Sequence, residues 1–317
     1  MKITIYIYCE NKRYEPTLLE ETKVTWCRKG TAGVLEFKVH RKGLRCFEGN
    51  PVAMYAGKTP FFYGYIFKKS RDEKEIISIT AYDQLRYLKN KDTYTYSGKA
   101  SDFIKRLAKD FGIRTGKIAD TGYSIPPRVE QNSTLFDMIQ NSLDITMMNT
   151  GKLYVLHDKF GALTLEDIES LTTNIVIDKD TAGKMDYTSS IDDETYNKIK
   201  LTYDNQDTGK REVYIAKDSS NINRWGVLQY YEELQDGENG QAKVDALLAL
   251  YNKKTRNLEV KDCIGSKKVI AGSFVIVMLF LGDIKVKNYM LVEKVVHKFK
   301  DNEHLMDLVL SGGEFIE

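Results

Sequence analysis

The 317-residue sequence has few prolines and cysteines, little excess charge and no long apolar run. Its longest apolar run, Phe274–Leu281, is far shorter than the about 20 residues of a membrane-spanning helix, so we expect no membrane insertion. The 47 basic and 45 acidic residues leave a formal net charge of +2. Because nucleic-acid binding needs a concentrated basic surface, no such binding is expected.

The four cysteines are too far apart in the sequence to form a metal or redox motif. They lie at Cys9, Cys27, Cys46 and Cys263, and no two of them form a CxxC pair. A zinc site normally draws on such closely spaced ligands. We therefore expect four separate, mostly buried thiols and no metal site.

Motifs that mark common catalytic sites are also missing. The sequence contains no GxGxxG, GxxxxGK[ST] or GxSxG, and no cysteine precedes a helical pattern. Two of the four histidines, His297 and His304, flank the turn KFKDNE and could approach each other across a hairpin. We interpret them as surface residues beside a charged turn. The sequence thus predicts no catalytic residue and no cofactor.

Three acidic clusters remain as candidates for acid–base chemistry, since paired catalytic carboxylates can be far apart in sequence. Each cluster falls in a polar turn or at a strand end, where a solvated surface role is expected. The clusters are Asp72–Glu73, Asp192–Asp193–Glu194 and Glu232–Glu233.

Aromatic residues are abundant, with 20 tyrosines and 13 phenylalanines, and they favour strands. Residues 2–8, 34–40 and 51–56 read as strands, and a long hairpin follows over 61–82. No helix longer than one turn is expected in this region. The pattern predicts a small tube-like β-barrel domain over residues 1–96.

Residues 97–175 change to a mixed pattern. A helix with an apolar stripe begins near Ser101, its expected cap, and ends at Gly112. A loop with Pro126 and Pro127 follows, and Thr134 begins a second helix that ends before Gly151. Asp137 completes a capping box with Thr134. A hairpin then turns at Lys159–Gly161. These elements predict an α+β insert.

The β pattern returns over residues 176–317, where we expect a second tube-like barrel. Strands are predicted at 198–205, 210–219 and 224–234, and a helical insertion at about 238–256. The C-terminal hairpin within 277–311 echoes the one at 61–82. With an offset of 229, Ile77, Ile79 and Ala81 fall on Met306, Leu308 and Leu310, while Ile66 falls on Val295 and Lys69 on Lys298. The fold class is therefore α+β, mainly β, with two similar barrels, an α+β insert and one additional helix.

The order and spacing of several runs resemble the baseplate hub proteins of contractile phage tails. The closest group is the XkdQ-like PBSX prophage tail proteins, relatives of the late control protein D hubs. The resemblance is strongest over residues 60–170. The runs that carry it are ITAYDQLRYLKN, YSGKASDFIKRLAKDFGI, GKIADTGY, IPPRVEQNSTLFDMIQNSLDIT and TGKLYVLHDKFGALTL.

The resemblance implies a structural, non-enzymatic protein of the virion tail baseplate, assembled in the cytoplasm of a bacterial host. It implies a homotrimer whose six barrels form a pseudo-sixfold ring between a hexameric tail tube and a trimeric spike. The implied partners are the tail tube protein, the central spike protein and other baseplate proteins of a phage, prophage or phage-tail-like bacteriocin. The hairpin regions Phe61–Phe67 and Tyr289–Phe299 would then form the ring.

Two other function classes stay open. A tail-associated peptidoglycan hydrolase is one, although the sequence offers no activated nucleophile. A carbohydrate-binding module is the other, because Trp26, Trp225 and Tyr230–Tyr231 could stack on sugars. Trp225 and the tyrosine pair read as part of one alternating strand, which favours a role in a core or an interface.

Overall fold

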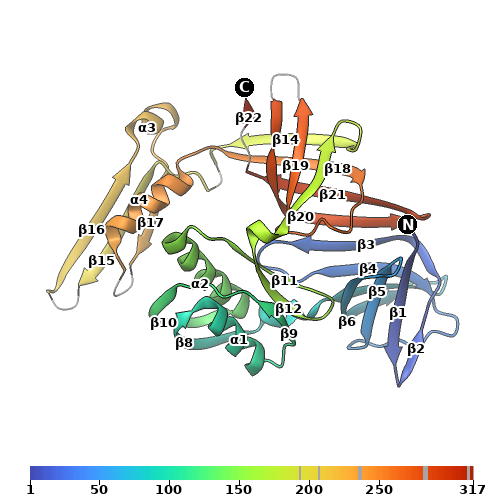
Figure 1. Ribbon diagram of the computed structural model, residues 1–317. Helices are drawn as coiled ribbons and strands as arrows, with labels where there is room; N and C mark the ends of the chain where they lie inside the picture. Colours follow the sequence, from blue (N-terminus) through green and yellow to red (C-terminus); the bar gives the residue numbers. More distant parts are fainter. Residues whose placement is uncertain (193, 206–207, 235–237, 281–284, 313–314, 317) are drawn as a thin grey trace. The chain divides into compact units, whose positions relative to one another are not determined.

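The computed structural model describes residues 1–192, 194–205, 208–234, 238–280, 285–312 and 315–316. The chain forms two compact units (Figure 1). The first comprises Met1–Asp186 and Leu258–Glu317, and the second comprises Tyr187–Asn257. The fold is α+β and mainly β, as the sequence predicts. None of the helices in the described ranges is long and apolar enough to cross a membrane.

The N-terminal part of the first unit is a meander of β strands. Its elements are β1 (Ile3–Cys9), β2 (Lys12–Tyr14), β3 (Leu18–Cys27), β4 (Val34–His40), β5 (Pro51–Ala56), β6 (Thr59–Arg71), β7 (Ile76–Tyr82) and the 3-10 helix η1 (Gln84–Lys89). Alternate side chains point into one core, as in β4, where Leu35, Phe37 and Val39 are all at most 2% exposed. The period of two in the sequence arises from this alternation of faces.

The middle of the first unit is the mixed segment that the sequence predicts. It comprises β8 (Lys91–Lys99), α1 (Ala100–Asp110), β9 (Thr115–Ile118), β10 (Ser124–Thr134), α2 (Leu135–Thr150), β11 (Tyr154–Asp158), β12 (Leu163–Asp167) and η2 (Ile168–Leu171). Both helices pack their apolar faces into one core with β8, β11 and β12. The hairpin at Lys159–Gly161 is confirmed, since β11 and β12 pair on either side of it.

The helix boundaries in this segment are partly as predicted. Thr134 caps α2 by accepting from the Asp137 amide at 3.1 Å, and Gly151 ends the helix with a left-handed φ of 69°. The cap predicted at Ser101 is wrong, because α1 begins at Ala100 after Lys99. The loop predicted around Pro126 and Pro127 is also wrong. Both prolines lie in β10 at an irregularity of its pairing with β8, where no ladder N–H is needed.

The C-terminal part of the first unit is again a β meander. Its strands are β13 (Thr172–Asp178), β14 (Lys184–Ser190), β18 (Thr255–Ile264), β19 (Phe274–Phe280), β20 (Lys285–Lys300), β21 (Glu303–Ser311) and β22 (Phe315–Ile316), with β14 and β18 reaching the start and end of the second unit. The described part of the predicted apolar run forms β19, and its last residue, Leu281, lies outside the described residues.

Both meanders connect their strands in the same way. The first pairs β1 with β5, β5 with β6, β6 with β7, β7 with β4 and β4 with β3. The second pairs β13 with β19, β19 with β20, β20 with β21, β21 with β18 and β18 with β14. In chain order the six strands of one meander thus correspond to the six of the other. The orientation differs in one pair, since β13 runs parallel to β19 whereas β1 runs antiparallel to β5.

The correspondence extends to individual residue pairs. Ile66 pairs with Ala81 directly before a bulge in β6, and Val292 pairs with Leu310 directly before a bulge in β20. The offset of 229 is therefore confirmed for β7 and β21, where Ala81 corresponds to Leu310. It is wrong for β6, because Ile66 corresponds to Val292 instead of Val295. The β20–β21 hairpin continues for three more pairs, ending at Lys300 and Glu303, which accounts for the difference.

The second unit is a three-stranded sheet with two helices. Its elements are β15 (Lys198–Asn205), β16 (Lys210–Lys217), α3 (Ser219–Trp225), β17 (Gln229–Glu233) and α4 (Gly240–Tyr251). Ile199 and Leu201 of β15 and Val244 and Leu247 of α4 are buried. The long strand predicted over 224–234 is wrong, because Trp225 ends α3 and Gly226 separates it from β17.

Candidate assembly interface

The two meanders join through one pair of strands, β3 and β20. Six residue pairs connect them, from Lys294 opposite Cys27 to Phe299 opposite Thr22. This pairing makes the strands of both meanders part of a single 14-stranded sheet. The two hairpins that the sequence predicts as ring-forming elements thus meet within one chain, because Phe61 of β6 packs on His297 and Phe299 of β20.

Aromatic rings fill one side of this junction. The Phe61 ring lies 5.1 Å from Trp26, 5.1 Å from His297 and 5.4 Å from Phe299, measured between ring centroids. His304 of β21 stacks on Phe299 at 4.3 Å. Edge-to-face and stacked contacts of this kind add about 0.5–1.5 kcal/mol each beyond the area they bury. The cluster therefore stabilises the connection between the two meanders.

The two histidines contact each other, as the sequence suggested, but His297 is not a surface residue and His304 is only partly exposed. His297 Nδ1 lies 2.9 Å from His304 Nε2, and His297 Nε2 lies 3.0 Å from the carbonyl oxygen of Val269. His297 is completely buried. Its burial lowers the pKa of its imidazole to about 3, and burial likewise lowers the pKa of His304 to about 4. Both rings are therefore neutral at pH 7 and hold their partners as uncharged hydrogen-bonding groups.

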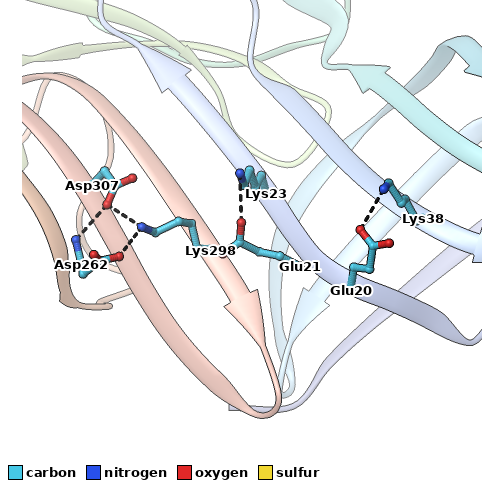
Figure 2. Close-up of polar contacts among 7 residues, drawn as sticks. All are labelled: Glu20, Glu21, Lys23, Lys38, Asp262, Lys298 and Asp307. Carbon is cyan, nitrogen blue, oxygen red and sulfur yellow. Dashed lines mark hydrogen bonds and ion pairs between the residues drawn. The ribbon is translucent and has the colours of Figure 1, made fainter.

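The outward-facing side of the same strands carries a row of charged pairs (Figure 2). Lys298 of β20 bonds Asp307 at 2.7 Å and Asp262 at 2.5 Å. Lys23 of β3 lies directly opposite Lys298 in the ladder and pairs with Glu21 at 2.9 Å. Like charges opposite each other are unfavourable, and these carboxylates offset that repulsion. The ammonium of Lys298 also holds the pKa of Asp262 below its usual value.

A further polar contact closes the end of the junction. The Arg28 guanidinium forms two bonds with the Glu293 carboxylate, at 2.7 Å and 3.0 Å, and the Arg28 amide donates to the Glu293 carbonyl at 2.9 Å. Two parallel charge-assisted bonds of this kind fix the register of the two segments as well as their distance. The junction is therefore held by backbone pairing, aromatic packing and a bidentate ion pair together.

A cavity of about 250 Å³ lies beside the aromatic cluster. Its lining includes Trp26, Phe61, Asp83 and Asp158. Asp83 is fully used, since it accepts from the amides of Gly33 at 2.8 Å and Leu85 at 3.0 Å. Asp158 accepts from the Gly161 amide at 2.6 Å through one oxygen, while its other oxygen is buried without a partner. Burial raises the pKa of both carboxyls, that of Asp158 to about 6.

Two of the three acidic clusters that the sequence left open contain a carboxylate with a structural contact. Asp72 accepts from the Lys74 and Ile76 amides in the β6–β7 turn, and Glu232 bonds Lys243 of α4 at 2.8 Å. Asp193 lies outside the described residues. Over the described ranges, no three His, Cys, Asp or Glu residues are arranged to hold a metal ion.

The cysteines are unpaired thiols, as expected. Cys9, Cys46 and Cys263 are buried and Cys27 is partly buried. Sequence reasoning missed three features of the junction: the β3–β20 pairing, the Arg28–Glu293 pair and the cavity. Each joins residues that are far apart in the chain, and no local pattern marks them.

Solved structures with this fold are phage tail and secretion-system proteins. The structure superposes on the 43 kDa tail protein of prophage MuSo2 from Shewanella oneidensis with a TM-score of 0.71, 13% identity and coverage of 97% of this chain and 98% of that chain. A component of the E. coli type VI secretion system, described as similar to the T4 tail proteins gp27 and gp5, has a TM-score of 0.59 at 8% identity, with 99% and 77% coverage. The fold is therefore that of phage tail proteins.

The family is narrower than the fold. The model of the YqbQ-like family matches residues 22–311, and the chain belongs to that family. The phage-like element PBSX protein XkdQ of Bacillus subtilis is 34% identical over 273 residues, which cover 82% of this chain and 81% of XkdQ. The resemblance that the sequence runs suggested is thereby confirmed.

Proposed function

We propose that this protein is a structural baseplate hub of a contractile phage tail or phage-tail-like bacteriocin, with no catalytic role. In this proposal three copies form a pseudo-sixfold ring that adapts the hexameric tail tube to the trimeric spike. The protein would reside in the virion tail baseplate after assembly in the host cytoplasm. Its partners would be the tail tube protein, the central spike protein and other baseplate proteins.

The duplicated meander is the observation that carries the proposal. A chain with two equivalent β units can present six such units when three copies surround one axis, so a trimer can match a sixfold partner. Residues 1–96 and 176–317 would be the two tube-like domains of the ring, and 97–175 the insert between them in sequence. The family membership and the tail-protein fold support the same assignment.

The test is the assembly state of the full chain. Light scattering after size-exclusion chromatography should give the mass of three copies of the 36.4 kDa chain, and negative-stain images should show a ring with an open centre. A particle that stays a monomer at high concentration, both alone and when mixed with its cognate spike protein, would contradict the trimeric hub.

A second candidate, the tail-associated peptidoglycan hydrolase, draws on the cavity. Asp158 has an unpartnered buried oxygen there and a pKa raised to about 6, as a general acid requires. Turbidity of purified cell walls gives the test, with Asp158→Asn compared against Ser170→Ala, which changes an exposed residue of η2. Clearance by the wild type that Asp158→Asn abolishes and Ser170→Ala retains would favour the hydrolase over the non-enzymatic hub.

A further inference from the structure

Among the strand edges of the first unit that have no strand partner in the described residues, those of β14 and of the end of β6 belong to the duplicated meanders. Strand β14 lies at the end of the 14-stranded sheet and has β18 as its single strand neighbour there. Strand β6 pairs with β5 as far as Tyr65, but its last residues, Lys68–Arg71, pair with β7 on one side alone. Unpaired edges of this kind can accept a strand from another molecule.

The duplicated meander shows what such an edge of β6 can hold. Strand β20 corresponds to β6, and Lys294 of β20 occupies the position of Lys68, since each is the first residue paired after the bulge. From Lys294 onward, the edge of β20 away from β21 is occupied by β3. The edge that is open in β6 is therefore paired in β20.

The loops before β5 and β19 are anchored to the neighbouring strand by equivalent backbone hydrogen bonds. Gly49 donates to the Ile66 carbonyl at 2.7 Å, and Gly272 donates to the Val292 carbonyl at 2.7 Å. Both glycines have a positive φ, 85° and 91°. Farther along, Lys69 Nζ donates to the Cys46 carbonyl at 2.8 Å. Beside the loop of the second meander β3 pairs with β20, so a loop anchored in this way is compatible with a strand at that edge. In the first meander the Phe47 ring and the Glu48 carboxylate also contact Lys69 of this edge.

The strand that corresponds to β3 in the second meander is β14. Each is the second strand of its six in chain order. Strand β3 pairs with β4, the neighbour of β7, and β14 pairs with β18, the neighbour of β21. Strand β3 uses its outer edge to bind β20, whereas the outer edge of β14 has no strand partner in the described sheet. Within one chain, β3 of the first meander pairs with β20 of the second. The equivalent contact, between β14 and β6, requires a second chain.

We infer that β14 of one copy pairs with the Lys68–Arg71 edge of β6 in a second copy, repeating between chains the β3–β20 contact made within one. This inference rests on the proposed assembly of hub copies and names the strands that connect them. The contact is heterologous, so it generates a closed ring or an open filament according to the rotation between copies. The Phe67 carbonyl would accept an incoming amide, as the corresponding Glu293 carbonyl accepts the amide of Arg28.

The chemistry of the two edges fits a specific partner. Lys68, Lys69 and Arg71 place three cations on four residues, which discourages two β6 edges from pairing with each other. Strand β14 carries one exposed carboxylate, Asp186, and one exposed cation, Lys184, so it adds no net charge to this basic edge, whereas a second β6 edge would add three cations. A copy of β14 therefore suits the edge of β6 better than a second β6 does.

Cysteine cross-linking of the full chain tests the contact. In a Cys27→Ser background, Ser70→Cys is combined in turn with Lys184→Cys, Met185→Cys and Asp186→Cys, so that three successive positions cover the possible registers. Facing residues of paired strands lie within the Cα separation that a disulfide needs. Mild oxidation of at least one double variant should convert most of the protein to disulfide-linked oligomers. A reductant should return these oligomers to monomers on a denaturing gel. The single-cysteine variants set the background.

Ser78→Cys with Asp186→Cys is the matched control. Ser78 lies opposite Ser70 in β7, whose two edges are both taken, by β4 and β6, so this pair should stay uncoupled. A ring of three copies that forms without any Ser70 cross-link would overturn the β14–β6 contact and leave the proposed hub intact. A chain that neither assembles nor cross-links would overturn both.

Discussion

Replacing the buried histidine at the junction should change how the stability of the protein depends on pH. His297 is completely buried and its pKa is lowered to about 3, whereas an unfolded chain has a histidine pKa near 6.5. Between these values the unfolded state binds more protons than the folded state at this site. The contribution of His297 to the free energy of unfolding therefore decreases as pH falls below 6.5.

The magnitude follows from this difference in pKa. Each pH unit within the window costs about 1.4 kcal/mol, so lowering the pH from 6.5 to 4.5 removes about 2.7 kcal/mol through His297. Asp158 acts in the opposite direction, because its pKa is raised to about 6 and the folded state binds its proton more readily than the unfolded state. His304, with its pKa lowered to about 4, acts in the same direction as His297. The wild-type profile therefore sums several groups, and a variant is needed to isolate His297.

The variant is His297→Phe, whose ring fits among Trp26, Phe61 and Phe299. It removes the hydrogen bond to the buried Val269 carbonyl, which should cost about 1–3 kcal/mol at pH 7. At pH 4.5 the wild type has lost its histidine contribution and the variant has not, so the two free energies of unfolding should converge. Urea denaturation of both proteins at pH 7 and 4.5 measures this, with His40→Phe as an exposed control. A gap that is the same at both pH values would refute the reasoning.

Two further changes probe the core and the backbone. Leu308→Ala, at a residue 1% exposed in β21, should lower the free energy of unfolding by about 2–5 kcal/mol, whereas Phe280→Ala, at a residue 73% exposed, should change it by less than about 0.5 kcal/mol. Guanidinium titration compares the two, and equal losses would contradict the assignment of the core. Gly33→Ala should destabilise by about 1–3 kcal/mol, because the new Cβ would lie 2.4 Å from Asp83 Oδ2 and 2.5 Å from Trp26 Cδ1. Thermal denaturation of Gly33→Ala and of the control variant Thr31→Ala measures this loss. The Tm should fall for Gly33→Ala and not for Thr31→Ala.

Local patterns predicted single elements well and long-range register poorly. The capping box at Thr134 and Asp137 and the glycine at 151 are local signals, and α2 begins and ends at them. Ser101 failed as a cap because α1 begins one residue earlier, at Ala100, so that Lys99 holds the cap position and makes no side-chain cap hydrogen bond. The strand predicted through Trp225 failed because alternation over a few residues does not separate a short helix from a strand.

The duplicated hairpin shows the same limit. Its apolar periodicity was visible in the sequence, and the match of Ile77, Ile79 and Ala81 to Met306, Leu308 and Leu310 is correct. The match of Ile66 to Val295 was three residues off. The bulge after Val292 shifts the alternation by one residue, so that Val292 and Val295 are both buried, and periodicity does not report the length of a hairpin. The two-residue turn at Asp301 and Asn302, both with positive φ, sets that length in β20–β21.

The sequence by itself determined that this protein is mainly β, that it carries an α+β insert and that it builds a similar hairpin twice, because alternation and capping are encoded by neighbouring residues. Only the tertiary structure decided that the two meanders share one sheet through β3 and β20 and that His297 is buried between them. It also left the edges of β6 and β14 open among the described residues. The strand pairing and the burial of His297 depend on contacts between residues more than 200 positions apart, and a local pattern carries no information on such pairs.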